Sequence, residues 1–151
     1  MSQAAWLEEL SNEECLELLR SRSVGRIGFT VDGFPFVVPV NYRLVEAGGT
    51  TPDAWIALRT RPGNVIDQAA DDVAFEIDNV DVYHQGGWSV LVRGTLHEID
   101  PDAANIRERF DPQPWIDTER DAWLIIEPFA VTGRRLHGPE IEWAFHVRAY
   151  L

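Results

Sequence analysis

Short segments in which apolar and polar residues alternate recur along most of this chain, and they restrict its fold more than any other feature. In residues 24–31, Ile27, Phe29 and Val31 share one side, and small or polar residues occupy the other. A period of two is typical of β-strands that bury one face. The same pattern predicts strands over 34–45, 54–60, 73–78, 88–99 and about 121–133, and residues 141–148 fit it as well.

Turn and helix signals separate these segments. Asp32-Gly33 favours a tight hairpin, and loops are expected at 46–53, 79–87 and 111–115. Pro35 and Pro39 cannot donate to a ladder, so the strand over 34–45 is expected to have breaks or to lie at an edge. These features predict a mostly antiparallel barrel or sandwich with helical connections, formed as one domain over residues 1–151.

Few helices are expected, and all of them are short. Ser11 and Glu14 have the spacing of a capping box, which predicts a helix of about ten residues. Cys15 lies on its apolar face and is interpreted as a core residue, not a nucleophile. Two further short helices are predicted at 62–70 and 102–110.

Charge and composition exclude several classes of function. The chain has 25 acidic and 13 basic residues, for a net charge of −12, so nucleic acid and anionic membranes are not expected as partners. No apolar run is long enough to span a bilayer, and the first residues are acidic, which favours a soluble cytoplasmic protein. Every basic residue is an arginine, so any anion site must use arginine, backbone N–H groups or a helix N-terminus.

Motifs for metal or nucleophilic catalysis are missing from the sequence. There is no phosphate-binding loop, no dinucleotide fingerprint, no HExxH and no GxSxG. The four histidines lack ligand spacing, so no metal is expected, and no side chain has a motif that assigns it a catalytic role.

A series of short motifs carries a family resemblance. The motifs are VGRIGF (24–29), DGFPFVVPVNY (32–42), ALRTRPGNVIDQA (57–69), VAFEID (73–78), GWSVLVRGTLHEI (87–99), PW (114–115) and VTGRR (131–135). In this order they resemble the pyridoxamine 5′-phosphate oxidase-like flavoproteins, in particular the small single-domain branch that includes nitroimidazole reductases. The resemblance covers about residues 10–136. It implies a six-stranded split β-barrel and a homodimer that binds FMN in two clefts at its interface.

The resemblance assigns cofactor roles to particular residues. It places the segment Val38-Pro39-Val40-Asn41 along the isoalloxazine, where a ladder interrupted by Pro39 leaves backbone groups free. Arg59, Thr60 and Asn64 are candidates for the phosphate, although an exposed arginine and an ordinary helix cap explain them equally well. Relatives often carry lysine where Asn64 stands, and nitroimidazole reductases often carry histidine where Arg59 stands.

Four later residues complete the candidate set. Trp88 and Ser89 are expected near the cofactor, with a tryptophan that anchors the barrel or dimer as the alternative for Trp88. Arg134 and Arg135 are expected to reach a cofactor bound mainly by the other subunit, or to form a surface pair. Arg26 and Arg93 are interpreted as structural ion-pair partners of Glu76 or Asp78.

The expected function is therefore an FMN-dependent oxidoreductase that exchanges hydride between the flavin, NAD(P)H and a small substrate. One alternative keeps the fold with a deazaflavin or with haem, for which His84 and His137 are the candidate axial ligands. A second alternative is a homodimer without enzymatic activity, either flavin-binding or cofactor-free.

Overall fold

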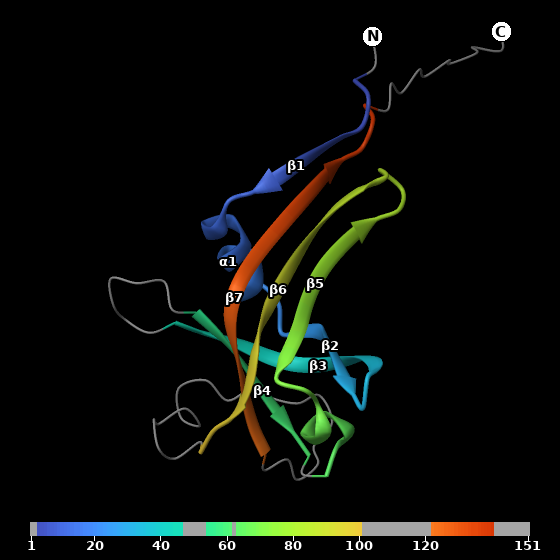
Figure 1. The fold of residues 1–151 in the computed structure, drawn as a ribbon. Coiled ribbons are helices and arrows are strands. Elements are labelled where there is room, and N and C mark those ends of the chain that lie inside the picture. Colours follow the sequence, from blue (N-terminus) through green and yellow to red (C-terminus); the bar gives the residue numbers. More distant parts are fainter. Residues whose placement is uncertain (1–2, 47–53, 62, 101–121, 141–151) are drawn as a thin grey trace, which may run out of the picture.

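The computed structural model describes residues 3–46, 54–61, 63–100 and 122–140 (Figure 1). The only α-helix among them is α1. In chain order the elements are β1 (Trp6–Leu10), α1 (Asn12–Arg20), β2 (Val24–Val31), β3 (Phe34–Glu46), β4 (Ala54–Thr60), the 3₁₀ helix η1 (Val65–Gln68), β5 (Asp72–Asp81), β6 (Gly86–Glu98) and β7 (Ala122–His137).

Six of the strands close into a barrel. The hydrogen-bonded order is β7-β4-β3-β2-β5-β6, and β6 pairs again with β7, so the ring is complete and every pairing is antiparallel. β1 is a seventh strand that pairs with the C-terminal part of β7. Closure removes most exposed strand edges. The expected antiparallel barrel is thus confirmed, with β1 as an addition that the sequence pattern did not predict.

Beyond the barrel, β1, the end of β7 and the β5–β6 hairpin continue as an extended sheet (Figure 1). A loop over 79–87 was expected here, and that prediction is wrong, because β5 runs to Asp81 and β6 begins at Gly86. Val80 is out of phase with Val73, Phe75 and Ile77, so the alternation gave no sign that β5 continues to Asp81. β7 also extends past the expected end at 133, to His137.

The strand with two prolines is continuous. β3 runs from Phe34 to Glu46, but it pairs with β4 only from Tyr42 onward. Pro35 and Pro39 therefore lie in the half of β3 that pairs with β2 on one side and with none of the described strands on the other. Proline is tolerated at such an edge because no ladder hydrogen bond is lost there. Of the two expectations, the edge is confirmed and the breaks are wrong.

Helix α1 begins as its sequence predicts. The Glu14 N–H donates to the Ser11 hydroxyl at 3.2 Å, and the Ser11 N–H donates to the Glu14 carboxylate at 2.8 Å. The apolar face of α1 joins the barrel core, and Cys15 is fully buried in it. Burial raises the pKa of the Cys15 thiol, which fits a packing role. A Cβ on Gly133 would lie 2.5 Å from the Cys15 sulfur, so only glycine allows this packing.

Three expected elements cannot be compared with the structure. The helix predicted at 102–110, the loop at 111–115 and the strand at 141–148 lie outside the described residues. Within the described ranges, no helix is long and apolar enough to cross a membrane.

Candidate functional site

Strand alternation divides the candidate cofactor residues between the two faces of the barrel wall. Successive side chains on a strand point to opposite faces, and the inner face here is the one occupied by the buried core. Val38, Val40 and Trp88 pack against that core, and Thr60 is almost fully buried. The alternation places Pro39, Asn41, Arg59, Ser89 and Arg134 on the outer face.

The outer face brings together Ser89 and Arg134. Ser89 on β6 lies directly opposite Arg134 on β7, and Asp78 on β5 lies opposite Ser89 on its other side. Within the described part of the chain, the Ser89 hydroxyl and the Arg134 guanidinium have no hydrogen-bond or ion-pair partner. Glu9 on β1 lies opposite Arg134 on its other side, and no ion pair joins the two. A hydroxyl donor beside a guanidinium that forms no ion pair with a described residue is a suitable pair for an anion such as a phosphate.

An ion-pair network lies next to this pair. The Arg26 Nε donates to Glu76 at 2.8 Å, and its guanidinium also lies 3.1 Å from Asp78. The hydrogen bond to Glu76 raises the pKa of Arg26. The prediction for Arg26 is confirmed. The prediction for Arg93 is wrong, because Arg93 lies between Ala74 and Ala130 on the neighbouring strands and forms no ion pair with any described residue.

On the inner face, Arg135 and Trp88 belong to a different cluster. Arg135 lies opposite Trp88, and Glu8 of β1 lies 3.8 Å from Arg135 and 2.7 Å from His137. Trp6 stacks on His137, and Arg22 lies over the Trp88 ring at 5.3 Å from its centroid. Sequence reasoning missed Trp6, Glu8 and Arg22 because the pattern gave no sign that residues 6–10 pair with the end of β7.

The segment predicted to hold a phosphate satisfies several of its own polar groups. The Asn64 side chain caps η1 by accepting from the Val65 N–H at 2.7 Å. The Gly63 N–H donates to the Asp67 carboxylate at 2.6 Å. An anion that approached these N–H groups would have to replace the Asp67 carboxylate, and η1 is far shorter than the helix expected over 62–70.

Arg59 and Thr60 begin this segment and face opposite ways. Arg59 lies on the outer face, with its guanidinium 5.6 Å from the centroid of the Trp123 ring. The Thr60 hydroxyl is buried and has no hydrogen-bond partner within the structure as described. Arg59 is thus the member of this pair whose side chain lies on the outer face.

The free edge of β3 supplies backbone groups beside Pro39. The Tyr42 N–H donates to the Ser23 carbonyl at 2.9 Å, so even-numbered residues of β3 direct their backbone groups toward β2. The odd-numbered residues Val37, Pro39 and Asn41 therefore direct theirs toward the unpaired edge. This geometry agrees with the expectation that backbone groups near Pro39 are available to a ligand.

Each histidine that the structure describes lies within hydrogen-bond distance of a carboxylate. His84 Nδ1 lies 2.6 Å from Asp81, His97 Nε2 lies 3.1 Å from Glu127, and His137 is bound to Glu8. Hydrogen bonds from His84 lower the pKa of Asp81. Among the described residues, no group of three or more histidine, cysteine, aspartate or glutamate side chains is arranged to hold a metal ion. His146 lies outside those residues.

A closed six-stranded antiparallel barrel, extended by a long hairpin, defines this chain as a split-barrel protein. The chain belongs to the pyridoxamine 5′-phosphate oxidase family, whose model matches residues 11–135. An uncharacterized protein of Mycobacterium tuberculosis is 34% identical over 132 residues, which are 85% of this chain and 84% of that protein.

Two solved structures are also similar to this chain. A FAD binding protein from Mycobacterium smegmatis is 30% identical with a TM-score of 0.63, over 86% of this chain and 98% of that one. A putative pyridoxamine 5′-phosphate oxidase from Corynebacterium glutamicum is 30% identical with a TM-score of 0.71, over 87% and 98% of the two chains. These matches confirm the family that the sequence motifs indicate.

Proposed function

We propose that this protein is an FMN-dependent oxidoreductase that binds its flavin against the outer face of the barrel. The observation that carries the proposal is the pair formed by Ser89 and Arg134, which face each other across β6 and β7 without another partner among the described residues. The similarity to a FAD binding protein from Mycobacterium smegmatis supports a flavin as the ligand.

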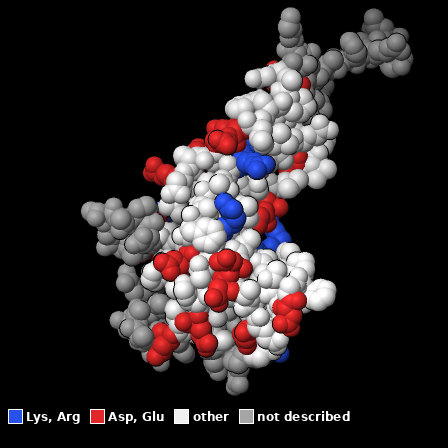
Figure 2. All heavy atoms as spheres, viewed as in Figure 1, with Lys and Arg blue, Asp and Glu red and all other residues white. Residues whose placement is uncertain are grey.

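The outer-face residues fit the parts of a flavin. A phosphate needs charge-assisted donors, which Ser89 and Arg134 provide at one place on the outer face. Arg59 lies opposite Trp123, eleven residues before Arg134 on β7, so in one subunit it offers a donor at a separate place. The polar edge of the ring needs hydrogen-bonding groups, and the backbone at Val37, Pro39 and Asn41 is directed to a free strand edge. Acidic side chains gather over the end of the barrel that carries η1, and the basic side chains visible in Figure 2 lie nearer the middle of the molecule, with acidic ones beside them.

When bound, a flavin supplies the capacity to accept and return a hydride. The protein itself would hold the phosphate through Arg134 and Ser89 and orient the ring along β3. No described side chain is placed to act as a general acid or base by its geometry, so we assign binding and orientation, not proton transfer, to the chain. NAD(P)H as the reductant would place this reaction in the cytoplasm.

The proposal includes a homodimer formed through the outer face. Leu7, Leu136 and Val80 lie in one row across β1, β7 and β5, and 57%, 43% and 67% of their respective surfaces are exposed. An apolar row of this kind, next to polar residues, is typical of a protein interface. A partner seated there would cover a flavin ring that a single barrel wall leaves open on one side.

The absorbance spectrum of the purified protein tests the proposal directly. We expect the two visible bands of oxidised flavin, released as FMN on denaturation, and bleaching of both bands when NAD(P)H is added without oxygen. A protein that purifies without flavin and does not quench the fluorescence of added FMN or FAD would overturn it. A Soret band would instead support haem, and the spectrum of a deazaflavin would support that cofactor.

A second candidate, a cofactor-free dimer without enzymatic activity, is favoured by the local structure around Asn64. Asn64 stands where relatives often carry lysine, and its side-chain oxygen accepts a hydrogen bond from the Val65 N–H. The Gly63 N–H already donates a hydrogen bond to the Asp67 carboxylate at 2.6 Å. Together these contacts weaken the 59–64 segment as a phosphate site, and the same spectrum distinguishes this candidate from the first.

A further inference from the structure

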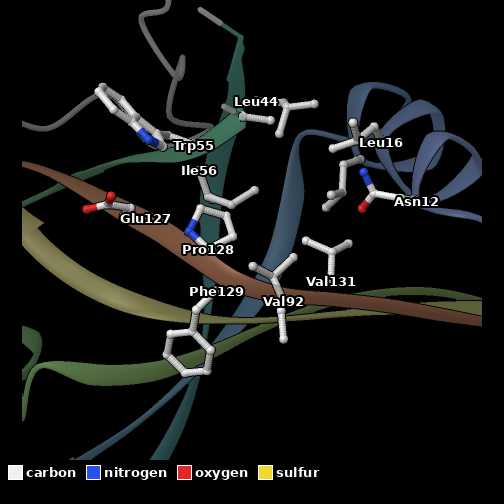
Figure 3. Close-up of a pocket in the computed structure, with 13 residues that line it drawn as sticks. Asn12, Leu16, Leu44, Trp55, Ile56, Val92, Glu127, Pro128, Phe129 and Val131 are labelled. Atoms are coloured by element: carbon white, nitrogen blue, oxygen red, sulfur yellow. The ribbon is translucent and has the colours of Figure 1, made fainter. Parts of the chain in front are cut away.

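A groove lies beside β7 where the barrel wall is incomplete. Pairing with β4 ends at Ile126 and pairing with β1 begins at Gly133, so residues 127–132 have neither strand as a neighbour. The groove runs between this stretch and α1 and has a volume of about 290 Å³ (Figure 3). Among the described residues that line it, Glu127 is the only charged one. The groove therefore offers no cation to an anionic ligand, in contrast to the outer face of the barrel.

Arg93 belongs to a row of residues that crosses this outer face. Residues paired on neighbouring strands lie about 5 Å apart, and their side chains share a face. The pairings place in one row, from β7 to β3, the residues Ala130, Arg93, Ala74, Gly28 and Val37. One guanidinium therefore lies beside two short side chains on β5 and β2, and the row ends at the edge of β3.

The Arg93 guanidinium has no protein partner. It forms no hydrogen bond or ion pair with any described residue, although Asp72 and Glu76 lie on the same face of the neighbouring strand. Glu76 is bound to Arg26 at 2.8 Å. The alanines directly opposite Arg93 carry no polar side-chain atom. In a chain with 25 acidic residues, an exposed arginine that none of the described acids engages is available to a negatively charged ligand.

Gly28 lies inside β2, although neither its backbone nor its packing requires glycine. Its φ is outside the left-handed region, and a Cβ there would lie no closer than 3.8 Å to its nearest neighbour, Ala74. At Gly25 and Gly94, in contrast, a Cβ would lie 2.3 Å and 2.4 Å from other atoms. Glycine weakens a strand, and inside one it often marks a place where a ligand approaches the backbone closely.

These neighbours favour a ligand with one negative charge and a flat body. The planar guanidinium matches a carboxylate in bidentate geometry. A second negative charge on the ligand would lie near Asp72 and Glu76, on a chain of net charge −12, so a phosphate monoester is disfavoured. A flat ring or conjugated chain can approach the sheet over Ala74 and Gly28, and Val37, 70% exposed, offers an apolar contact beyond them.

We propose that Arg93, Ala74 and Gly28 bind the substrate of the proposed flavin site, a flat organic carboxylate with its charge at Arg93 and its body over Gly28. The inference rests on the proposed function for the reaction, but the binding itself uses none of the phosphate donors assigned to the flavin. Val37 belongs both to this row and to the strand edge assigned to the flavin ring, so the substrate would lie between Arg93 and the ring.

An NMR titration of the purified protein tests the inference. The probes are benzoate, benzamide and phenyl phosphate, each with and without added FMN, and the signals followed are the Arg93 Nε–H and the Gly28 N–H. We expect benzoate to bind about two- to fivefold more tightly than benzamide, which is the gain from one exposed charge-assisted contact. Phenyl phosphate should bind more weakly than benzoate. Equal affinities of benzoate and benzamide, or tighter binding of phenyl phosphate, would overturn the carboxylate site.

The same titration separates this inference from the proposed function. If benzoate shifts both signals in a protein that binds no FMN, the carboxylate site stands and the flavin function fails. If the protein binds FMN and neither signal responds to benzoate, the carboxylate site alone is wrong.

Two arginine variants distinguish a local contact from the general field of the protein. Arg93→Gln should reduce the affinity for benzoate about two- to fivefold, to that of benzamide, and leave benzamide unchanged. Arg61→Gln removes the same charge from another exposed arginine that forms no ion pair with a described residue, beyond the end of β4, and should change neither. An equal loss in both variants would show that net charge alone attracts benzoate, which contradicts a site at Arg93.

A valine at position 28 tests where the body of the ligand lies. Gly28→Val fills the space over the backbone and should abolish the binding of benzoate and benzamide alike. Valine suits a strand, so the urea midpoint should not fall. Thr30→Val, two positions further along the same face of β2, is the control and should leave both affinities unchanged. Unaltered benzoate affinity in a folded Gly28→Val protein would contradict the inference.

Discussion

Arg134 and Arg135 are neighbours in the chain but point to opposite faces of β7. Arg134 faces Ser89 on the outer face, whereas Arg135 faces Trp88 on the inner face and lies 3.8 Å from Glu8. Each arginine has a glutamate opposite it on β1, but only Arg135 forms an ion pair with its neighbour, Glu8, and the sheet separates the two guanidinium groups. Of the two, Arg134 is therefore the one that faces a ligand on the outer face. The pair that the sequence presents as one basic motif therefore divides into a candidate ligand residue and a structural one.

This division predicts different outcomes for the two arginines. Arg134→Ala should weaken FMN binding about tenfold, the lower end of the range for a charge-assisted bond, because the site is exposed. Arg135→Ala should change FMN affinity less than about twofold. Titration of flavin fluorescence measures both. A larger loss in the Arg135 variant than in the Arg134 variant would reverse the assignment of the two faces.

Asn64 allows a second test at the residue scale. Asn64→Lys restores the charge that relatives often carry, and if the 59–64 segment meets the phosphate, FMN affinity should rise about fivefold. Gln68→Lys, at the other end of η1, controls for the general gain from one positive charge on an acidic chain. If the two variants gain equally, Asn64 does no more than cap η1.

At the scale of elements, α1 depends on its first turn. Ser11 and Glu14 exchange hydrogen bonds, and Leu10, Cys15 and Gly133 pack together at the same point. Ser11→Ala removes one of these bonds and should lower the free energy of unfolding by about 1 kcal/mol. Urea unfolding followed by circular dichroism measures it. An unchanged midpoint would mean that packing alone fixes the start of α1.

The same cap makes the stability of the protein depend on pH. The hydrogen bonds from Ser11 lower the pKa of Glu14 below its ordinary value of 4.5. A lowered pKa means that the folded state favours the ionised carboxylate, so this stabilisation is present above pH 4.5 and is lost as the pH falls through the lowered pKa. Glu14→Gln should therefore reduce the difference in urea midpoint between pH 6 and pH 3 relative to the unaltered protein, at roughly constant ionic strength. An identical difference in both proteins would contradict this account.

At the scale of the whole molecule, the extended sheet carries the surface through which we propose that two copies meet. Its outer face carries the row of Leu7, Leu136 and Val80, which a monomer would leave exposed. We expect a homodimer with an interface well above about 1,000 Å². Leu136→Glu should shift the protein to a monomer in sedimentation velocity runs, because it places a charge in the centre of the apolar row.

Val82→Glu is the control for this dimer prediction. Val82 is 83% exposed but lies in the turn beyond the paired residues of β5, outside the row. The Val82→Glu substitution should therefore leave the dimer intact. A monomer at micromolar concentration before any substitution would contradict the homodimer itself.

Local patterns alone determined most of the barrel strands, the hairpin at Asp32-Gly33 and the capping box, because each depends on residues that are close in the chain. The order of the short motifs along the chain indicated the family. The ladder partners of each strand were decided only by the tertiary structure, since pairing joins residues far apart in sequence. Closure through β6 and β7, the addition of β1 and the gap beside residues 127–132 all follow from those long-range pairings. These pairings decide which side chains lie next to Ser89, Arg134 and Glu127 on the same face of the sheet. Those neighbours determine the chemistry that the three residues can perform.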